Sequence, residues 1–342
     1  MTHPRRVLIA LIGLLLAIAL PAGATTFKIA TAAPDGTTWM KAMREGAAEV
    51  KKRTGGRVKF RFYPGGVMGN DNSVIRKIKV GQLDGAALTG GSLNSIYPDA
   101  QIYSLPFSFR DYAEVDYVRG KMDPGIIQGL YDKGYVSFGI SEGGFAYLFS
   151  REPVTITADL RTRKVWIPEG DRINLAAFAE FGVSPVQLAM TDVLTALQTG
   201  LIDTVATTPV GAIALQWHTR VKYLTDTPLL YVYGTIVVQR RDFEKLSAAD
   251  QAVVREVMGG VFARLNKLNR ADNEKAYAAL KQQGIEFVHP GPEAVAEWRA
   301  GGHRAVAKMV QTGYLSQALI DSFNRRLAEY RASHPGNDAQ SP

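Results

Sequence analysis

The chain has 342 residues, with 40 Lys and Arg against 32 Asp and Glu, a formal net charge of +8 and no cysteine. The lack of cysteine excludes a disulfide framework, thiol chemistry and a cysteine-ligated metal. The basic residues are scattered among acidic ones and form no stripe interleaved with aromatic residues, so we expect no nucleic-acid partner.

The N-terminus has the anatomy of a secretory signal peptide. Arg5 and Arg6 precede an apolar run over residues 7–20, then Pro21 and the small residues 22–24. A membrane anchor is the alternative, but a run of about 14 residues is shorter than the roughly 20 that span a bilayer. No cysteine follows the run, which excludes lipid anchoring. We predict cleavage of residues 1–24 after Ala24, a mature chain that begins at Thr25, and a periplasmic location.

The first half of the chain alternates strands and helices. Residues 26–30, 58–62 and 84–89 have the pattern of strands, and residues 37–54 and 71–80 that of helices. This order predicts an α/β domain with a largely parallel sheet.

The second half repeats this order. A strand is expected at 163–168 and helices at 172–181 and 191–199, the last capped by Thr191. The segments 200–205 and 81–86 both place a glycine, an apolar residue and an aspartate before a short buried strand. Two α/β domains around a cleft are therefore expected.

Several elements of the C-terminal part connect or cover these domains. Residues 228–238 read as a long strand crossing between them, and a capping pattern at Ser247 begins a helix to about residue 284 that can bend at Gly259 and Gly260. Helices at 292–311 and 316–332 follow, and the tail is expected to be disordered from residue 333.

One segment resembles the active-site turn of serine hydrolases. Residues 139–143 match Gly-x-Ser-x-Gly, with Ser141 after a predicted strand and Asp203 and His218 in the chain order of a triad. A hydrolase needs a helix after the serine, whereas residues 143–149 begin with two glycines and read as a strand. A secreted serine hydrolase is thus a remote alternative, and the glycines favour a hinge.

Other chemistry has little support in the sequence. The five histidines form no i, i+4 pair, no calcium-loop pattern occurs, and no glycine-rich phosphate loop is present. His218 is more typical of a surface residue near a helix end. We expect no catalytic residue, no metal and no cofactor.

In their order and spacing, several segments resemble the solute receptors of TRAP transporters, the DctP-like family. They are residues 54–58, 63–69, 105–107, 164–168 and 196–203, including Tyr-Pro-Gly-Gly-Val-Met-Gly and Leu-Gln-Thr-Gly-Leu-Ile-Asp. The resemblance implies a periplasmic binding protein-like fold whose two lobes close on a small molecule, with a long helix across both. It also implies partner permease subunits in the membrane. We expect a monomer.

The resemblance suggests domain bounds as well. We expect residues 25–143 and about 232–271 in domain I, and residues 144–231 and about 272–332 in domain II.

Two departures from the family concern the ligand. The family clamps organic acids with an arginine on the inner strand of its second domain, where this chain has Trp166, and a second family arginine is replaced by Ala146. The other expected pocket residues, Thr89, Met190 and Thr207, carry no charge, and Trp39 is a candidate for stacking its ring on the ligand. This lining predicts an apolar or neutral ligand.

The alternative is an organic acid held by a displaced cation. Lys164 shares the strand face of Trp166 by alternation, whereas Arg163 lies on the opposite face, and Arg172 is a further candidate. Both ligand classes stay open.

Overall fold

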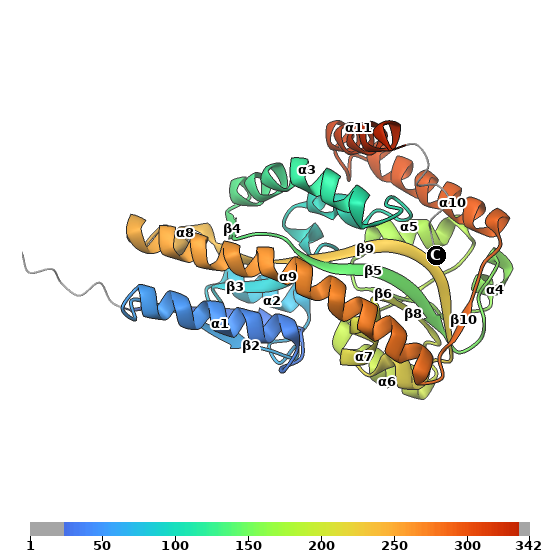
Figure 1. Ribbon diagram of the computed structural model, residues 1–342, viewed down its shortest axis with the longest axis horizontal. Coiled ribbons are helices and arrows are strands. Elements are labelled where there is room, and N and C mark those ends of the chain that lie inside the picture. Colours follow the sequence, from blue (N-terminus) through green and yellow to red (C-terminus); the bar gives the residue numbers. More distant parts are fainter. Residues whose placement is uncertain (1–23, 335–342) are drawn as a thin grey trace, which may run out of the picture.

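The computed structural model describes residues 24–334, which form two α/β lobes joined by shared strands and one long helix (Figure 1). The predicted signal peptide, apart from Ala24, and the residues from 335 onward lie outside this range.

The first lobe is built on a parallel βαβαβ unit. Strand β1 lies between β2 and β3, and helices α1 and α2 connect the three. Helix α1 begins where the Thr37 side chain accepts a hydrogen bond from the Met40 amide, and it buries Met40, Met43 and Val50 against the sheet. The elements are β1 (Thr25–Thr31), α1 (Thr38–Arg53), β2 (Val58–Tyr63), α2 (Asp71–Lys79) and β3 (Gly85–Thr89).

Two long strands carry the sheet from this lobe into the second. Strand β9 (Tyr223–Gln239) pairs antiparallel with β3 and also with β5 (Ser141–Ser150), and β5 pairs antiparallel with β8 (Thr204–Thr207). The order is β2-β1-β3-β9-β5-β8, with β4 (Tyr135–Ser137) and β10 (Glu286–Val288) also on β9. The predicted largely parallel sheet is therefore mixed, because β9 runs antiparallel to both β3 and β5.

The second lobe packs short elements around β5 and β8. A second, two-stranded parallel sheet pairs β6 with β7. The elements are α4 (Thr157–Arg161), β6 (Trp166–Pro168), α5 (Arg172–Glu180), β7 (Val186–Leu188), η3 (Met190–Asp192), α6 (Val193–Thr199), α7 (Pro209–Ala214) and η4 (Trp217–Arg220). Thr191 lies inside η3 rather than capping α6, whose first turn follows Asp192.

Helix α9 (Ala248–Gln282) lies across both lobes, in contact with α1 at one end and α7 at the other (Figure 1). The Ser247 side chain accepts a hydrogen bond from the Asp250 amide, as the capping pattern predicts. The helix runs through Gly259 and Gly260 without interruption.

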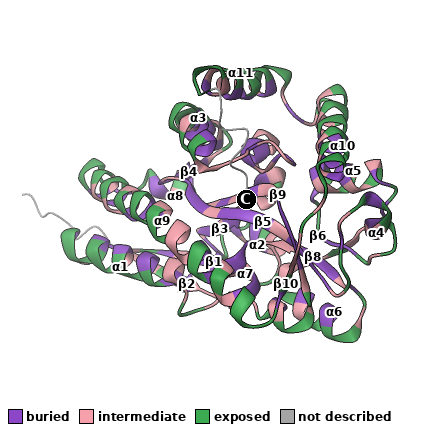
Figure 2. Cartoon of the chain, turned by 45° about the vertical axis from the view of Figure 1, so that its right-hand side comes forward, coloured by how far each residue is buried: buried purple, intermediate pink, exposed green. Residues whose placement is uncertain are grey.

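The remaining helices cover the outside, where exposed residues surround the buried strands (Figure 2). They are η1 (Ser92–Ser95), η2 (Pro98–Ser104), α3 (Tyr112–Asp132), α8 (Arg240–Phe243), α10 (Pro292–Gln311) and α11 (Gln317–Ser333). Residues 333 and 334 belong to the folded part and not to a disordered tail, because α11 includes Ser333 and the His334 ring stacks on Tyr330 at 4.2 Å. Within residues 24–334, no helix has the length and apolar character that a membrane crossing requires.

Candidate functional site

A cavity of about 300 Å³ lies between the lobes and is lined by residues from both. Thr89, Gly90 and Tyr233 come from the first lobe and the strand that leaves it. The second lobe contributes Ala146 and Leu148 from β5, together with residues of β6, α5, β8 and α7. A molecule held here contacts both lobes at once.

Five of the six predicted pocket residues meet in this cavity: Thr89, Ala146, Trp166, Met190 and Thr207. Thr89, Trp166, Met190 and Thr207 each stand at an end of a short element, whereas Ala146 lies in the middle of β5. Trp166 is fixed by its indole N–H, which donates to the Leu188 carbonyl at 3.0 Å, and by an edge-to-face contact with Trp217 at 5.2 Å between ring centroids. These two contacts fix the orientation of the Trp166 ring, which forms part of the cavity wall.

Trp39 and Lys164 do not line this cavity. Trp39 is half-buried against the core of the first lobe. Strand β6 begins only at Trp166, so the alternation that placed Lys164 on its face does not extend that far back. The exposed Lys164 ammonium donates to the Gly200 carbonyl at 2.9 Å.

The polar groups of the cavity are mostly uncharged. They include the hydroxyls of Thr89, Ser104, Thr207 and Thr208. None of the described residues that line the cavity is a lysine, an arginine or a histidine. Arg172, the other cation considered from the sequence, is exposed and lies over the Tyr314 ring.

One carboxyl group, that of Asp171, lines the cavity. It caps helix α5 by accepting from the Asn174 amide at 3.0 Å, and the Asn174 side-chain amide donates to it at 2.7 Å. Burial raises the pKa of Asp171 above its ordinary value, although these hydrogen bonds oppose the shift. A buried carboxyl group disfavours an anionic ligand in the same space.

The lobes also touch each other at the mouth of the cleft. The Asn70 side chain donates to Glu169 at 2.8 Å, and the Asn94 side chain donates to the Gly170 carbonyl at 3.0 Å. Gly66, with φ of +72°, lies so near Thr191 that an added Cβ would be 2.4 Å from its methyl group. These contacts describe a closed arrangement of the lobes.

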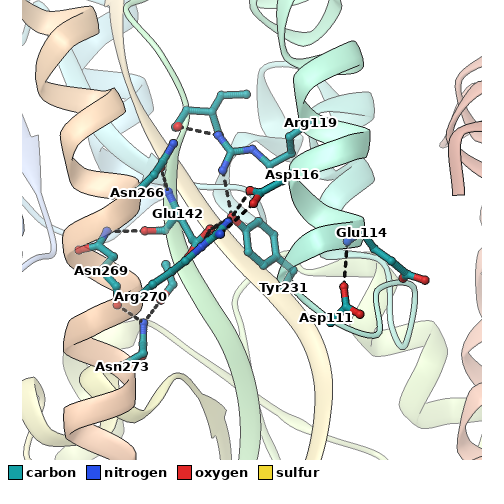
Figure 3. A network of polar contacts seen from close by, with 12 residues as sticks. Asp111, Glu114, Asp116, Arg119, Glu142, Tyr231, Asn266, Asn269, Arg270 and Asn273 are labelled. Carbon is teal, nitrogen blue, oxygen red and sulfur yellow. Dashed lines mark hydrogen bonds and ion pairs between the residues drawn. The ribbon is translucent and has the colours of Figure 1, made fainter. Parts of the chain in front are cut away.

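The segment 139–144 lies where β5 crosses from one lobe to the other. Glu142 is at the centre of a polar network that binds this segment to its neighbours (Figure 3). The fully buried Glu142 carboxylate accepts from the Arg270 guanidinium at 2.8 Å and from the Tyr231 hydroxyl at 3.0 Å. Arg270 also pairs with Asp116 of α3. The network ties β5, β9, α3 and α9 together at the crossing.

Asparagines of α9 hold the backbone of the same segment (Figure 3). Asn266 accepts from the Glu142 amide at 2.8 Å, Asn269 donates to the Glu142 carbonyl, and Asn273 donates to the Gly143 carbonyl at 2.7 Å. Gly144 has φ of +103°, and an added Cβ there would be 2.6 Å from Asn273. Gly139 and Gly144 thus serve close packing against α9, whereas Gly143 packs against Val232 of β9.

Ser141 lies within this packed segment and not on a nucleophile turn. Strand β5 continues after it, with no helix in the place that a hydrolase requires. The Ser141 hydroxyl is buried and donates to the Gly234 carbonyl at 3.4 Å. His218 is half-buried in η4 and its Nδ1 lies 3.0 Å from the Ala212 carbonyl oxygen. Within residues 24–334, no cluster of His, Asp and Glu is arranged to hold a metal ion.

Several cavity residues were not predicted from the sequence. Asp171, Phe178 and Phe181 come from or border α5, Trp217 from η4 and Trp298 from α10. Local patterns identify Asp171 as a helix cap, but nothing near Trp298 in the sequence indicates that α10 reaches the cavity. Phe107 also lines it, with an unusual positive φ of 55°.

The family model described as "bacterial extracellular solute-binding protein, family 7" matches residues 29–312. The chain is 30% identical over 252 residues to a solute-binding protein of Verminephrobacter eiseniae. The aligned region covers 71% of this chain and 72% of the relative. It is 26% identical over 307 residues to the C4-dicarboxylate-binding periplasmic protein DctP of Rhodobacter capsulatus, covering 86% and 90% of the two chains.

The fold also matches solved structures. The sugar acid binding protein of Advenella mimigardefordensis, in complex with galactonate, superposes with a TM-score of 0.83 at 19% identity, covering 90% of this chain and 99% of the other. At that identity the match bears on the fold alone. It agrees with the two lobes and the shared sheet described above.

Proposed function

The chain belongs to family 7 of the bacterial extracellular solute-binding proteins, the DctP family, and from that premise we propose that it captures an apolar or neutral small molecule. Members of this family are solute-binding receptors, so the chain is a receptor and not an enzyme.

The observation that carries the proposal is the uncharged lining of the cavity. Among the described residues that form it, aromatic and aliphatic side chains surround a few hydroxyls, and the one carboxyl group is already bonded to Asn174. An unpaired carboxylate in such surroundings would lose its hydration without gaining a cation. A neutral ligand avoids this cost while burying its apolar surface.

A pair of probes that differ only in charge tests this. We would titrate ligand-stripped protein calorimetrically with cinnamamide and with cinnamate, whose shapes nearly match. We expect the amide to bind more tightly and its affinity to change little with ionic strength. Tighter binding of the acid, weakening as salt is added, would contradict the proposal.

An organic acid is the second candidate. Two similar proteins favour it, because one is named as binding C4-dicarboxylates and the other is a sugar acid binding protein in complex with galactonate. In this chain an acid would have to be held by neutral donors such as the hydroxyls of Thr89 and Thr207, since Trp166 and Ala146 stand where the family's arginines are expected.

Capture is proposed to occur by hinge closure. Strands β5 and β9 cross between the lobes, and ligand contacts on both sides favour the closed arrangement. We place the boundary near residues 143–144 and 231–232, with domain I at 25–143 and about 232–271 and domain II at 144–231 and about 272–332.

The receptor is proposed to work in the periplasm as a monomer, delivering its ligand to TRAP-type permease subunits in the membrane. Solved proteins with this fold are described as TRAP periplasmic solute-binding proteins, which supports the partner class. N-terminal sequencing of the exported protein should begin at Thr25, and recovery of the intact N-terminus would contradict cleavage. Size-exclusion chromatography with light scattering tests the monomer.

A further inference from the structure

A second hollow, separate from the ligand cavity, lies between helices α10 and α11. Its volume is about 890 Å³, within the range of small-molecule sites. We call it the α10–α11 groove. The loop over residues 105–110 forms its floor, and Phe107 separates it from the interlobe cavity because its ring lines both.

One end of the groove is strongly basic. Arg110, Arg299, His303 and Arg331 all line it. Glu114 is a buried carboxylate beside this end and accepts two hydrogen bonds from the Arg331 guanidinium, at 2.6 and 2.9 Å. Glu114 also accepts from the Arg110 amide at 2.9 Å, so its oxygens are already occupied by other donors.

Arg299 is a buried, unsatisfied group among the described residues that line this groove. Its Nε is buried without a hydrogen-bond partner, which is rare for a buried polar atom and costly for a charged group. Burial lowers the pKa of Arg299, and the positive charges of Arg110 and Arg331 lower it further. An anion beside Arg299 would offset this repulsion and offer a charged acceptor to the guanidinium.

Most of the remaining lining is apolar, although Ser108, Gln311, Gln317 and Asn324 also belong to it. Val306 of α10 faces Ile320, Phe323 and Leu327 of α11 along its length. A small inorganic anion would leave this surface empty, whereas an alkyl chain would cover it. The chemistry that matches a basic end and an apolar trough is that of an amphiphilic carboxylate.

We propose that the α10–α11 groove is a second binding site, which takes an alkyl carboxylate with its head group at Arg299 and its chain between α10 and α11. The site is independent of the interlobe cavity and of the ligand proposed for it.

Photolabelling of the full mature chain locates the site directly. The probe is dodecanoate with a diazirine at its far end, used below its micelle concentration, and mass spectrometry maps the labelled residues. We expect label on α10 and α11, and weak labelling by the matching alcohol. Label confined to the strands of the interlobe cavity, or equal labelling by the alcohol, would overturn the proposal.

Two variants change the groove in different ways. Arg299→Gln removes the unsatisfied charge, and Ala328→Phe fills the trough from an exposed position of α11 without changing charge. The first should weaken labelling about tenfold or more, as loss of a charged hydrogen bond does, and the second should abolish it. Arg304→Gln is the matched control, because Arg304 lies on α10 but pairs with Glu180 outside the groove.

Folding and binding effects are separable. Arg299→Gln should melt no lower than the unmodified protein, since it removes a charge repelled by its neighbours. Unchanged labelling of α10 and α11 in both Arg299→Gln and Ala328→Phe would overturn the assignment, as would an equal loss in Arg304→Gln.

Discussion

The uncharged character of the interlobe cavity can be tested before any ligand is known, by placing a charge in its wall. Ala146 is 1% exposed, pairs with Leu230 of β9 and faces the cavity. Ala146→Arg introduces a guanidinium there, and Ala146→Met introduces an unbranched chain without charge. The comparison separates the effect of charge from that of volume.

The expected magnitudes follow from the surroundings. A cavity of about 300 Å³ lies next to the site, so the added methionine costs at most the about 1–3 kcal/mol typical of overpacking. Among the described residues that line the cavity, the one carboxyl group is that of Asp171, which Asn174 holds in place as the cap of α5. An unpaired buried charge costs about 3–5 kcal/mol, so Ala146→Arg should lower the free energy of unfolding by about that much below Ala146→Met.

Urea unfolding monitored by tryptophan fluorescence measures this difference. Equal stability of the two variants would refute the reasoning, since it would mean that the cavity already accommodates a cation. Selective stabilisation of Ala146→Arg by succinate would show in addition that the cavity has room for an acid.

Three other outcomes are expected. Gly66→Ala should weaken binding of the co-purified ligand, because its Cβ would meet Thr191 when the lobes close. Adding Thr191→Gly to this variant should restore part of the lost affinity in a calorimetric titration. Unchanged weak binding in the double variant would mean that backbone strain at residue 66, and not the contact with Thr191, causes the loss. Asp171→Asn should gain stability relative to the unmodified protein as pH rises above the ordinary pKa of an aspartate, because the raised pKa of Asp171 makes its ionised form costly in the folded state. A pH-independent difference in chemical denaturation would count against this. Ser141→Ala should leave ligand affinity within a few-fold, and labelling of Ser141 by a fluorophosphonate probe would reverse that conclusion.

Much of the fold was predictable because its signals are local. The cap at Ser247, the glycine after α6 and the alternating residues of β2 each act within one element. The antiparallel strands β5 and β9 were not predicted as parts of one sheet, because strand pairing depends on contacts far apart in the sequence.

In the candidate site, too, residues with a local sequence signal were predicted, and residues placed by tertiary contacts were not. Trp166 and Ala146 were predicted from the family resemblance, as the residues that occupy the positions of the family's two arginines, and both line the cavity. Lys164 was misplaced because strand alternation was assumed over residues that precede β6. Trp298 was missed since α10 packs on the second lobe only through tertiary contacts, with its indole N–H donating to Thr157 at 3.0 Å.

The identity of the natural ligand tests the central claim most directly. The exported protein would be purified from its own host without added ligand, denatured, and the released small molecule identified by mass spectrometry. Our account predicts, for the interlobe cavity, a mostly apolar molecule that fits it and has no ionised group at neutral pH. An alkyl carboxylate released beside it would come from the α10–α11 groove. A dicarboxylate or a sugar acid, released in a one-to-one ratio with the protein, would contradict it.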